Sequence, residues 1–115
     1  MIQVQDLMIG NYIKWKDNGS IFEITIDLFF DKYFCNHLNK GHFEPIILSE
    51  EILLKCGFEK LAETEYTINT YELDNVRVWV NNGKFFVLSL FHINYLHELQ
   101  QLYKILTKQE LEIKW

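Results

Sequence analysis

The sequence predicts a single α+β domain over residues 1–115, in which antiparallel β meanders pack with one short helix and one long C-terminal helix. Two Asn-Gly pairs, at 18–19 and 82–83, each separate two runs of alternating apolar residues, which indicates β-hairpins. Near the C-terminus, apolar residues instead recur at the spacing of an amphipathic helix. A composition that is 49% hydrophobic and 16% aromatic can supply a core.

The first hairpin is expected in NYIKWKDNGSIFEITID, residues 11–27. Asn18-Gly19 predicts a two-residue type I′ turn, because both central positions of that turn need positive φ. Pairing outward from the turn gives one apolar and one polar face, with the cross-strand partners Trp15 and Phe22, Ile13 and Ile24, Lys14 and Glu23, Tyr12 and Thr25.

The stretch YFCNHLNKGHF, residues 33–43, is expected to belong to a second hairpin. Tyr33 to Leu38 would form one strand, Asn39-Lys40-Gly41 the turn, and His42 to Ile47 the return strand. Pro45 cannot donate a backbone hydrogen bond, so the return strand should lie at an edge or end early. The two hairpins would make a four-stranded meander, which can curl into a small SH3-like barrel.

The segment LSEEILLKCGF predicts a two-turn helix from Glu50 to Cys56. Ser49 is a suitable N-cap, the adjacent glutamates favour the positive end of the helix dipole, and Gly57 is placed as a C′ glycine. The inward side chains would be Ile52, Leu53 and Cys56.

A second meander should follow this helix. Tyr66 to Glu72 alternates, Asp74-Asn75 is a turn, and VRVWVNNGKFFVLSLF is a hairpin around Asn82-Gly83. Both faces of that hairpin carry apolar residues, with the pairs Val78 and Val87, Val80 and Phe85 on one face, and Trp79 and Phe86, Arg77 and Leu88 on the other.

The long C-terminal helix is predicted from Leu96, Leu99, Tyr103 and Leu106, which Leu102 supports. Asn94 is the expected N-cap. Thr107 to Glu110 has the pattern of a capping box, which predicts that a second, short helix begins here and continues through Leu111.

The charge balance restricts the classes of partner. With 11 Lys and Arg against 16 Asp and Glu, the net charge is −5, which disfavours binding to a phosphate backbone and suits a basic protein partner. No apolar run approaches the roughly 18 residues of a membrane helix, and no basic region with an apolar run opens the chain. We therefore expect a cytoplasmic protein. Two cysteines, Cys35 and Cys56, do not make a disulfide framework.

Cys35, His37 and His42 have side chains that zinc prefers, and a strand would place Cys35 and His37 on one face. A structural zinc site needs four ligands, usually in close pairs, and the fourth is missing here. We therefore expect a hairpin with a buried cysteine and exposed histidines, and neither a metal nor another cofactor.

Catalysis is not indicated either. Ser20, Ser49 and Ser89 fall in a hairpin, at a cap and in a strand, so each already has a structural role. His92 and His97 are five residues apart, so they would point to different faces of a helix. Without an assembled catalytic group or a phosphate-binding glycine motif, the chain is not expected to be an enzyme.

The second apolar face of the Asn82-Gly83 hairpin is the strongest candidate for a binding surface. Either the first meander or the short helix covers it, or it is exposed as a partner-binding patch, since Trp, Phe and Arg dominate interface hot spots. The candidate partner-binding residues are Arg77, Trp79 and Phe86, with His37 and His42 as contacts at a rim.

Three segments, DLMIGNYI (6–13), LSEEILLKCGF (48–58) and YLHELQQLYKILTKQELEI (95–113), resemble small phage and prophage proteins of Bacteroidota-type bacteria. The shared pattern is a short IGN opening, an EE-x-LLK-x-GF helix and a final HxLQ-x-LY-x-LT-x-x-EL helix. It covers about a third of the chain and contains no catalytic motif. The matching residues are Gly10, Asn11, Leu53, Leu54, Gly57, Phe58, His97, Leu99, Gln100, Leu102, Tyr103, Leu106, Thr107 and Glu110.

This resemblance implies an accessory protein of a mobile element that acts in a bacterial host. Small acidic proteins of this kind bind and disable host machines, and anti-CRISPR proteins, which inhibit RNA-guided nucleases with basic surfaces, are the sharpest example. Two alternatives stay open: a nucleic-acid-binding accessory domain that uses aromatic residues on a small barrel, and a phage structural or assembly protein.

Overall fold

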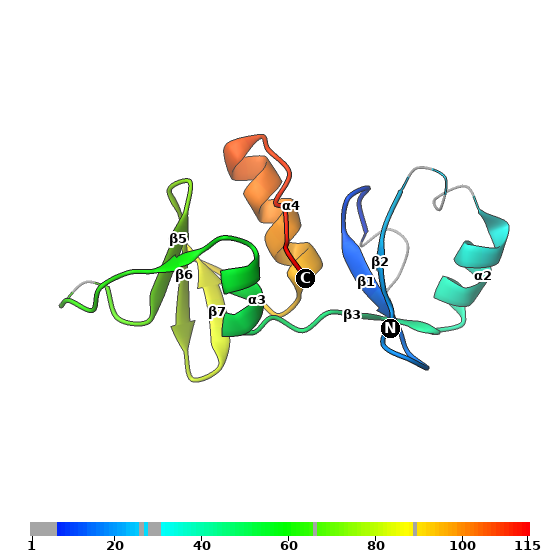
Figure 1. The fold of residues 1–115 in the computed structure, drawn as a ribbon, viewed down its shortest axis with the longest axis horizontal. Helices are drawn as coiled ribbons and strands as arrows, with labels where there is room; N and C mark the ends of the chain where they lie inside the picture. The colour runs from blue at the N-terminus through cyan, green and yellow to red at the C-terminus, as the bar shows by residue number, and fades with distance from the viewer. Residues whose placement is uncertain (1–6, 26, 28–30, 66, 89) are drawn as a thin grey trace. The chain divides into compact units, whose positions relative to one another are not determined.

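The computed structural model describes residues 7–25, 27, 31–65, 67–88 and 90–115 (Figure 1). The fold is α+β, as predicted: within the described residues, two antiparallel sheets of three and five strands are combined with helices α2, α3 and α4. The chain divides into two compact units, Met1–Ile46 and Ile47–Trp115, and each is described by itself. The single domain stays a prediction.

The first unit contains a three-stranded sheet and one described helix. Strand β1 (Tyr12–Trp15) lies between β2 (Ile21–Glu23) and β3 (Phe43–Pro45), and both pairings are antiparallel. Helix α2 (Lys32–Asn39) precedes β3. Six buried hydrophobic side chains of this unit form one cluster, against which Trp15 and Cys35 pack: Leu7, Ile13, Ile24, Phe34, Leu38 and Phe43.

The β1–β2 hairpin forms, but the predicted register is wrong by two residues. Ile13 pairs with Phe22, and Lys14 pairs with Ile21. The reason lies in the turn: only Gly19 takes positive φ, +73°, while the Asn18 Oδ1 accepts the Ser20 N–H instead. The loop is therefore longer than a type I′ turn. A shift of two residues keeps every side chain on its predicted face.

The strand predicted over Tyr33 to Leu38 is wrong, because these residues form α2. Asp31 is the N-cap, and its Oδ1 accepts the Phe34 N–H at 3.0 Å. Phe34 and Leu38, four residues apart, turn the same face of the helix into the core. In a run of only six residues, the hydrophobic period alone does not distinguish a helix from a strand.

The return strand is shorter than predicted, since β3 covers only Phe43–Pro45. It pairs with β1 alone and ends at Pro45, so the expected edge position is confirmed. The four-stranded meander and the SH3-like barrel are wrong: the described part of this unit has three strands in an open sheet. Lys14 forms its ion pair with Glu44 of β3, at 3.3 Å, rather than with Glu23.

The second unit contains a five-stranded sheet and two helices. Its elements follow the order α3 (Glu50–Lys55), β4 (Glu59–Lys60), β5 (Thr70–Leu73), β6 (Val76–Asn81), β7 (Lys84–Val87), β8 (Phe91–Ile93) and α4 (Leu96–Thr107). All strand pairings are antiparallel, in the order β4-β5-β6-β7-β8. The predicted strand start at Tyr66 and the serine Ser89 lie outside the described residues.

Helix α3 confirms its prediction. The Ser49 Oγ accepts the Ile52 N–H at 3.2 Å, and Gly57 follows the helix with φ of +96°. Leu53 and Cys56 are buried, and Ile52 is half-buried.

The β5–β6–β7 meander confirms both predicted turns, but β5 begins at Thr70 and leaves residues 67–69 outside the strand, and β7 ends before Leu88. Asp74-Asn75 and Asn82-Gly83 both have two consecutive residues with positive φ, which is the type I′ conformation. The register pairs Trp79 with Phe86 and Val80 with Phe85. The prediction did not include β4 and did not recognise β8 as a strand of its own; these two strands extend the sheet on both sides.

Helix α4 has the predicted buried face, formed by Leu96, Leu99 and Tyr103, although Leu106 is 43% exposed. Its N-cap is Tyr95 rather than Asn94, and the Glu98 carboxylate accepts the backbone N–H of both residues at 3.0 Å. A glutamate at N3 can serve these donors, so the Asn94 side chain is not needed for capping.

The short helix predicted after Thr107 is wrong. The Thr107 hydroxyl donates to the Tyr103 carbonyl and accepts the Gln109 N–H, and Lys108 takes φ of +61°. These bonds terminate α4 instead of capping a new helix. The last residues continue without helix, and Lys114 donates its N–H to the Lys55 carbonyl at the end of α3.

Candidate partner-binding surface

The five-stranded sheet has one buried and one open face. Alternate residues of β6 are buried, namely Val76, Val78 and Val80, and they share their face with Phe85 and Val87 of β7. Figure 1 shows α3 and α4 on one side of this sheet. Tyr71 pairs with Val78 and forms a side-chain hydrogen bond with Glu50, so α3 covers the valine face. The other face carries Trp79.

Three aromatic rings cross this open face in a row, one from each of three adjacent strands. Trp79 pairs with Phe86, and Phe86 pairs with His92 of β8. The ring centroids are separated by 5.3 Å and 5.2 Å, with interplanar angles of 36° and 31°. Trp79 and Phe86 are half-buried, whereas His92 is exposed. We call these three residues the aromatic row.

Charged side chains border the aromatic row on the β4–β5 side. Arg77 donates from Nε to the Glu72 Oε2 at 2.7 Å, and Glu72 lies directly opposite Glu59 on β4. Two carboxylates in one cross-strand pair are unfavourable for folding, and one arginine neutralises only one of them. This margin of the open face therefore keeps an excess of negative charge.

A hollow adjoins the same margin, where the segment before β5 passes Trp79 and Arg77. Its volume is about 520 Å³, and its wall includes Glu65, Ile68 and Asn69. Ile68 and Glu65 are exposed. The hollow thus combines an apolar side chain, an indole ring and a carboxylate, which suits a long amphipathic side chain better than a bare anion.

The β7–β8 turn adds apolar side chains at the end of the open face. Leu88 has φ of +54°, which is costly for a residue other than glycine, and its N–H donates to the Arg77 carbonyl at 3.0 Å. Leu90 is 79% exposed. Phe91 pairs with Val87 and therefore belongs to the other face of the sheet. Strained, exposed apolar residues next to an aromatic surface are typical of binding sites.

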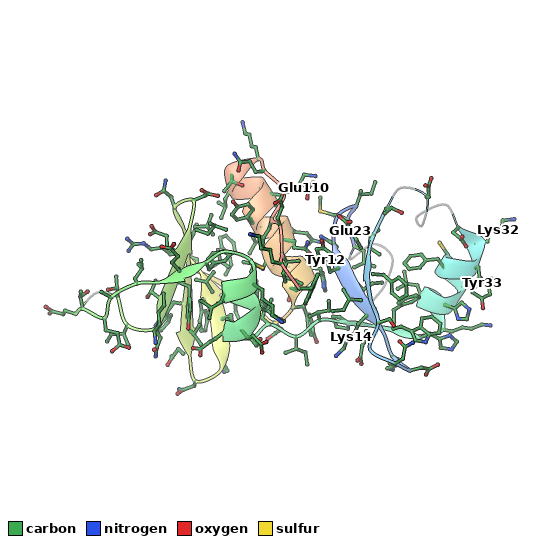
Figure 2. The ribbon with its side chains drawn as sticks, in the orientation of Figure 1. Tyr12, Lys14, Glu23, Lys32, Tyr33 and Glu110 are labelled. Atoms are coloured by element: carbon green, nitrogen blue, oxygen red, sulfur yellow. The ribbon has the colours of Figure 1, made fainter. Side chains whose placement is uncertain are left out.

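The histidines predicted at a rim lie together in the first unit. His37 is in the last turn of α2 and His42 precedes β3, and their Nδ1 atoms are 2.7 Å apart. Tyr33, which is 73% exposed, lies on the side of α2 away from the strands (Figure 2) and contacts the His37 ring at 4.2 Å between centroids.

The shared face predicted for Cys35 and His37 is wrong. Residues two apart on a helix point in nearly opposite directions, so Cys35 packs against the core cluster while His37 faces Tyr33. Among the described residues, no group of three or more His, Cys, Asp or Glu side chains could hold a metal ion.

The residues considered for catalysis take part in capping or packing instead. Ser49 caps α3, and His97 is buried and stacks on Tyr95 with centroids 5.7 Å apart. Burial raises the pKa of the Cys56 thiol to about 12, so the reactive thiolate is suppressed at neutral pH.

The structure therefore brings Arg77, Trp79 and Phe86 together on one face, and His37 and His42 together in the other unit. The prediction missed His92, because β8 was not separated from the preceding hairpin. The alternation of apolar and polar residues in Phe91–Ile93 is the sequence signal that could have indicated it.

No family model, curated protein or solved structure matches this chain. None of the described helices combines the length and the apolar character needed to cross a membrane.

Proposed function

We propose that the protein is a non-catalytic inhibitor or modulator that binds another protein through the open face of its five-stranded sheet. The aromatic row supports this proposal most strongly. Trp79 and Phe86 present large rings at low entropic cost, because the sheet register already fixes them side by side. Arg77, Leu88 and His92 complete the surface.

The charge of the surface indicates the chemistry of the partner. Glu59 and Glu72 lie on the open face together with Arg77 and Lys84, and Glu65 lines the adjacent hollow, within a chain of net charge −5. A partner with exposed lysines or arginines can place an alkyl stem on Trp79, its cation over the ring and near these carboxylates. The proposed partner is therefore a basic protein surface.

The resemblance to phage and prophage proteins supplies the setting for this proposal. A basic bacterial protein that such an element would need to inhibit is a host defence complex, such as an RNA-guided CRISPR nuclease. We therefore propose an anti-CRISPR activity, exerted in the cytoplasm of the bacterial host by occupying the nuclease surface rather than by chemistry.

The test is a DNA-cleavage assay with a purified RNA-guided nuclease from a Bacteroidota host, titrated with the full chain. The wild-type protein should inhibit cleavage, and W79A/F86A should raise the inhibitory concentration on the order of 30-fold, as expected for hot-spot aromatics. Ile105→Ala is the matched control, because Ile105 is 69% exposed on α4. The proposal fails if cleavage is unaffected, or if I105A weakens inhibition as much as the double variant.

One observation also favours a nucleic-acid-binding accessory role. A row of rings on an open antiparallel sheet is the arrangement on which single-stranded bases stack. The acidic margin opposes this reading, because phosphate contacts depend on Lys and Arg. Anisotropy with labelled single-stranded DNA and RNA at low salt distinguishes the two: tight binding that W79A/F86A removes would replace the protein-binding proposal.

A further inference from the structure

The last turn of α2 ends in a Schellman motif that joins His37 to His42. The His42 N–H donates to the His37 carbonyl at 3.0 Å, and the Gly41 N–H donates to the Leu38 carbonyl at 3.1 Å. Gly41 takes the left-handed conformation that this motif requires, with φ of +76°. The side chains at these two positions normally make an apolar contact, but here both are imidazoles.

The two rings meet through their nitrogens. The Nδ1 atoms are 2.7 Å apart and the ring centroids are 4.9 Å apart, so one proton lies between two lone pairs. Trp15 contacts both rings edge-on, at 5.1 Å from His37 and 5.9 Å from His42. Tyr33 contacts His37 from the other side. The backbone motif and these rings hold the two nitrogens together before any ligand arrives.

We propose that His37 and His42 form a two-nitrogen chelating site for a divalent transition-metal ion that prefers tetragonal geometry, Cu²⁺ first and Ni²⁺ second. The ion replaces the shared proton, and water occupies its remaining positions. With metal–nitrogen bonds of about 2.0 Å, two ligands at a right angle lie about 2.8 Å apart, whereas tetrahedral ligands lie about 3.3 Å apart. The observed separation of 2.7 Å is a hydrogen-bond distance that is already close to the right-angle spacing, and nitrogen ligands bind Cu²⁺ more tightly than the other divalent first-row ions.

The accessibility of the pair also fits this role. His42 is exposed and His37 is half-buried, so an ion can reach the nitrogens and small rotations of the rings can turn both lone pairs toward it. The two ligands are too few for a structural zinc site, which is closed by four. The site is independent of the aromatic row, so it does not rest on the proposed function.

The test is a Cu²⁺ titration of the tag-free full chain in a non-coordinating buffer, followed by electron paramagnetic resonance. We expect one Cu²⁺ per chain, an axial spectrum with hyperfine structure from two nitrogens, and quenching of tryptophan fluorescence because Trp15 is adjacent. His37→Ala and His42→Ala should each weaken binding about 100-fold, since the second ligand acts intramolecularly. His92→Ala, an exposed histidine of the other unit, should leave binding unchanged.

His42→Asn separates a metal site from a helix-terminating contact. Its amide can still hydrogen-bond to the His37 Nδ1 but is a poor ligand for Cu²⁺. It should therefore keep the melting temperature of the wild type and lose the two-nitrogen spectrum. The proposal is overturned if Cu²⁺ binds equally to His37→Ala and His42→Ala, if Zn²⁺ binds more tightly than Cu²⁺, or if His42→Asn keeps the wild-type spectrum.

Discussion

The aromatic row and the His37–His42 pair use similar residue types but are held in different ways. In the row, three antiparallel strands fix the rings at their cross-strand positions, so the rings lie side by side and expose their surfaces. In the pair, a helix terminus and a left-handed glycine turn two rings toward each other, edge to edge. The sheet thus presents its rings as a surface, whereas the helix terminus brings two side-chain nitrogens together at one point.

This difference explains why the two regions suit different ligands. Side-by-side rings bury apolar area, which favours a protein or a stack of bases. Convergent nitrogens offer lone pairs to a single atom, which favours a proton or a metal ion. The residue types alone, Trp, Phe and His, do not decide between these outcomes.

The largest expected effect distinguishes core rings from surface rings. Phe43 is buried and contacts Trp15, Phe22 and Phe34 at centroid distances of 4.9 to 6.0 Å. Phe43→Ala should therefore lower the free energy of unfolding by about 3–5 kcal/mol. W79A/F86A should cost less per ring removed, because both rings are only partly buried and already expose part of their surface to water. Urea denaturation measures both; an equal loss per ring would make the aromatic row part of the core.

The next effect concerns the packing beneath the aromatic row. The Tyr103 hydroxyl of α4 donates to the Asp74 carboxylate in the β5–β6 turn. Tyr103→Phe should cost about 1.5–3 kcal/mol at neutral pH, because the lost hydrogen bond has a charged acceptor.

The same hydroxyl gives a pH dependence with a definite sign. Burial, followed by the bond to Asp74, raises the pKa of Tyr103 to about 12 from 10.0. The unfolded chain therefore loses this proton first, and the stabilisation present below pH 10 is lost as the pH rises toward 12. Burial also raises the pKa of Cys56 from 9.0 to about 12, with the same sign. Thermal melts from pH 8 to 12 should fall less steeply for Tyr103→Phe; an unchanged slope would contradict this assignment.

Much of the second unit could be predicted from the sequence because its signals are local. Asn82-Gly83 and Asp74-Asn75 each supply two residues that tolerate positive φ, and these turns fix the register of the strands between them. Ser49 and Gly57 likewise bound α3 at positions that the sequence indicates. The candidate row followed from this register, except for His92.

The first unit could be predicted less well because its decisive interactions are ambiguous in sequence. Asn18-Gly19 predicts a two-residue turn, yet the Asn18 side chain accepts a backbone N–H and leaves positive φ to Gly19 alone. Gly41 was correctly expected to turn the chain, but a glycine after a helix and a glycine in a hairpin look alike. The contact between His37 and His42 forms only if Gly41 follows a helix, and because the sequence does not show this, the contact could not be predicted.

The smallest expected effect comes from a matched pair of glycines, which tests whether the glycine after α2 determines the contact between His37 and His42. Gly41 and Gly83 both have φ of +76°, one in the Schellman motif and one in the type I′ turn. Replacing either by alanine should cost about 1–2 kcal/mol, because a Cβ is unfavourable in this conformation, and at Gly83 the added atom would meet nothing within 4 Å. Calorimetry measures both losses.

The two variants should differ in what else they change. Gly41→Ala displaces the His42 backbone from its bond to the His37 carbonyl, so it should weaken Cu²⁺ binding together with stability. Gly83→Ala distorts the turn beside Trp79 and Phe86 and should leave Cu²⁺ binding at the wild-type level. If both variants bind Cu²⁺ as the wild type does, the helix terminus does not hold the His37–His42 pair together. The contrast drawn between this pair and the aromatic row on the sheet is then wrong.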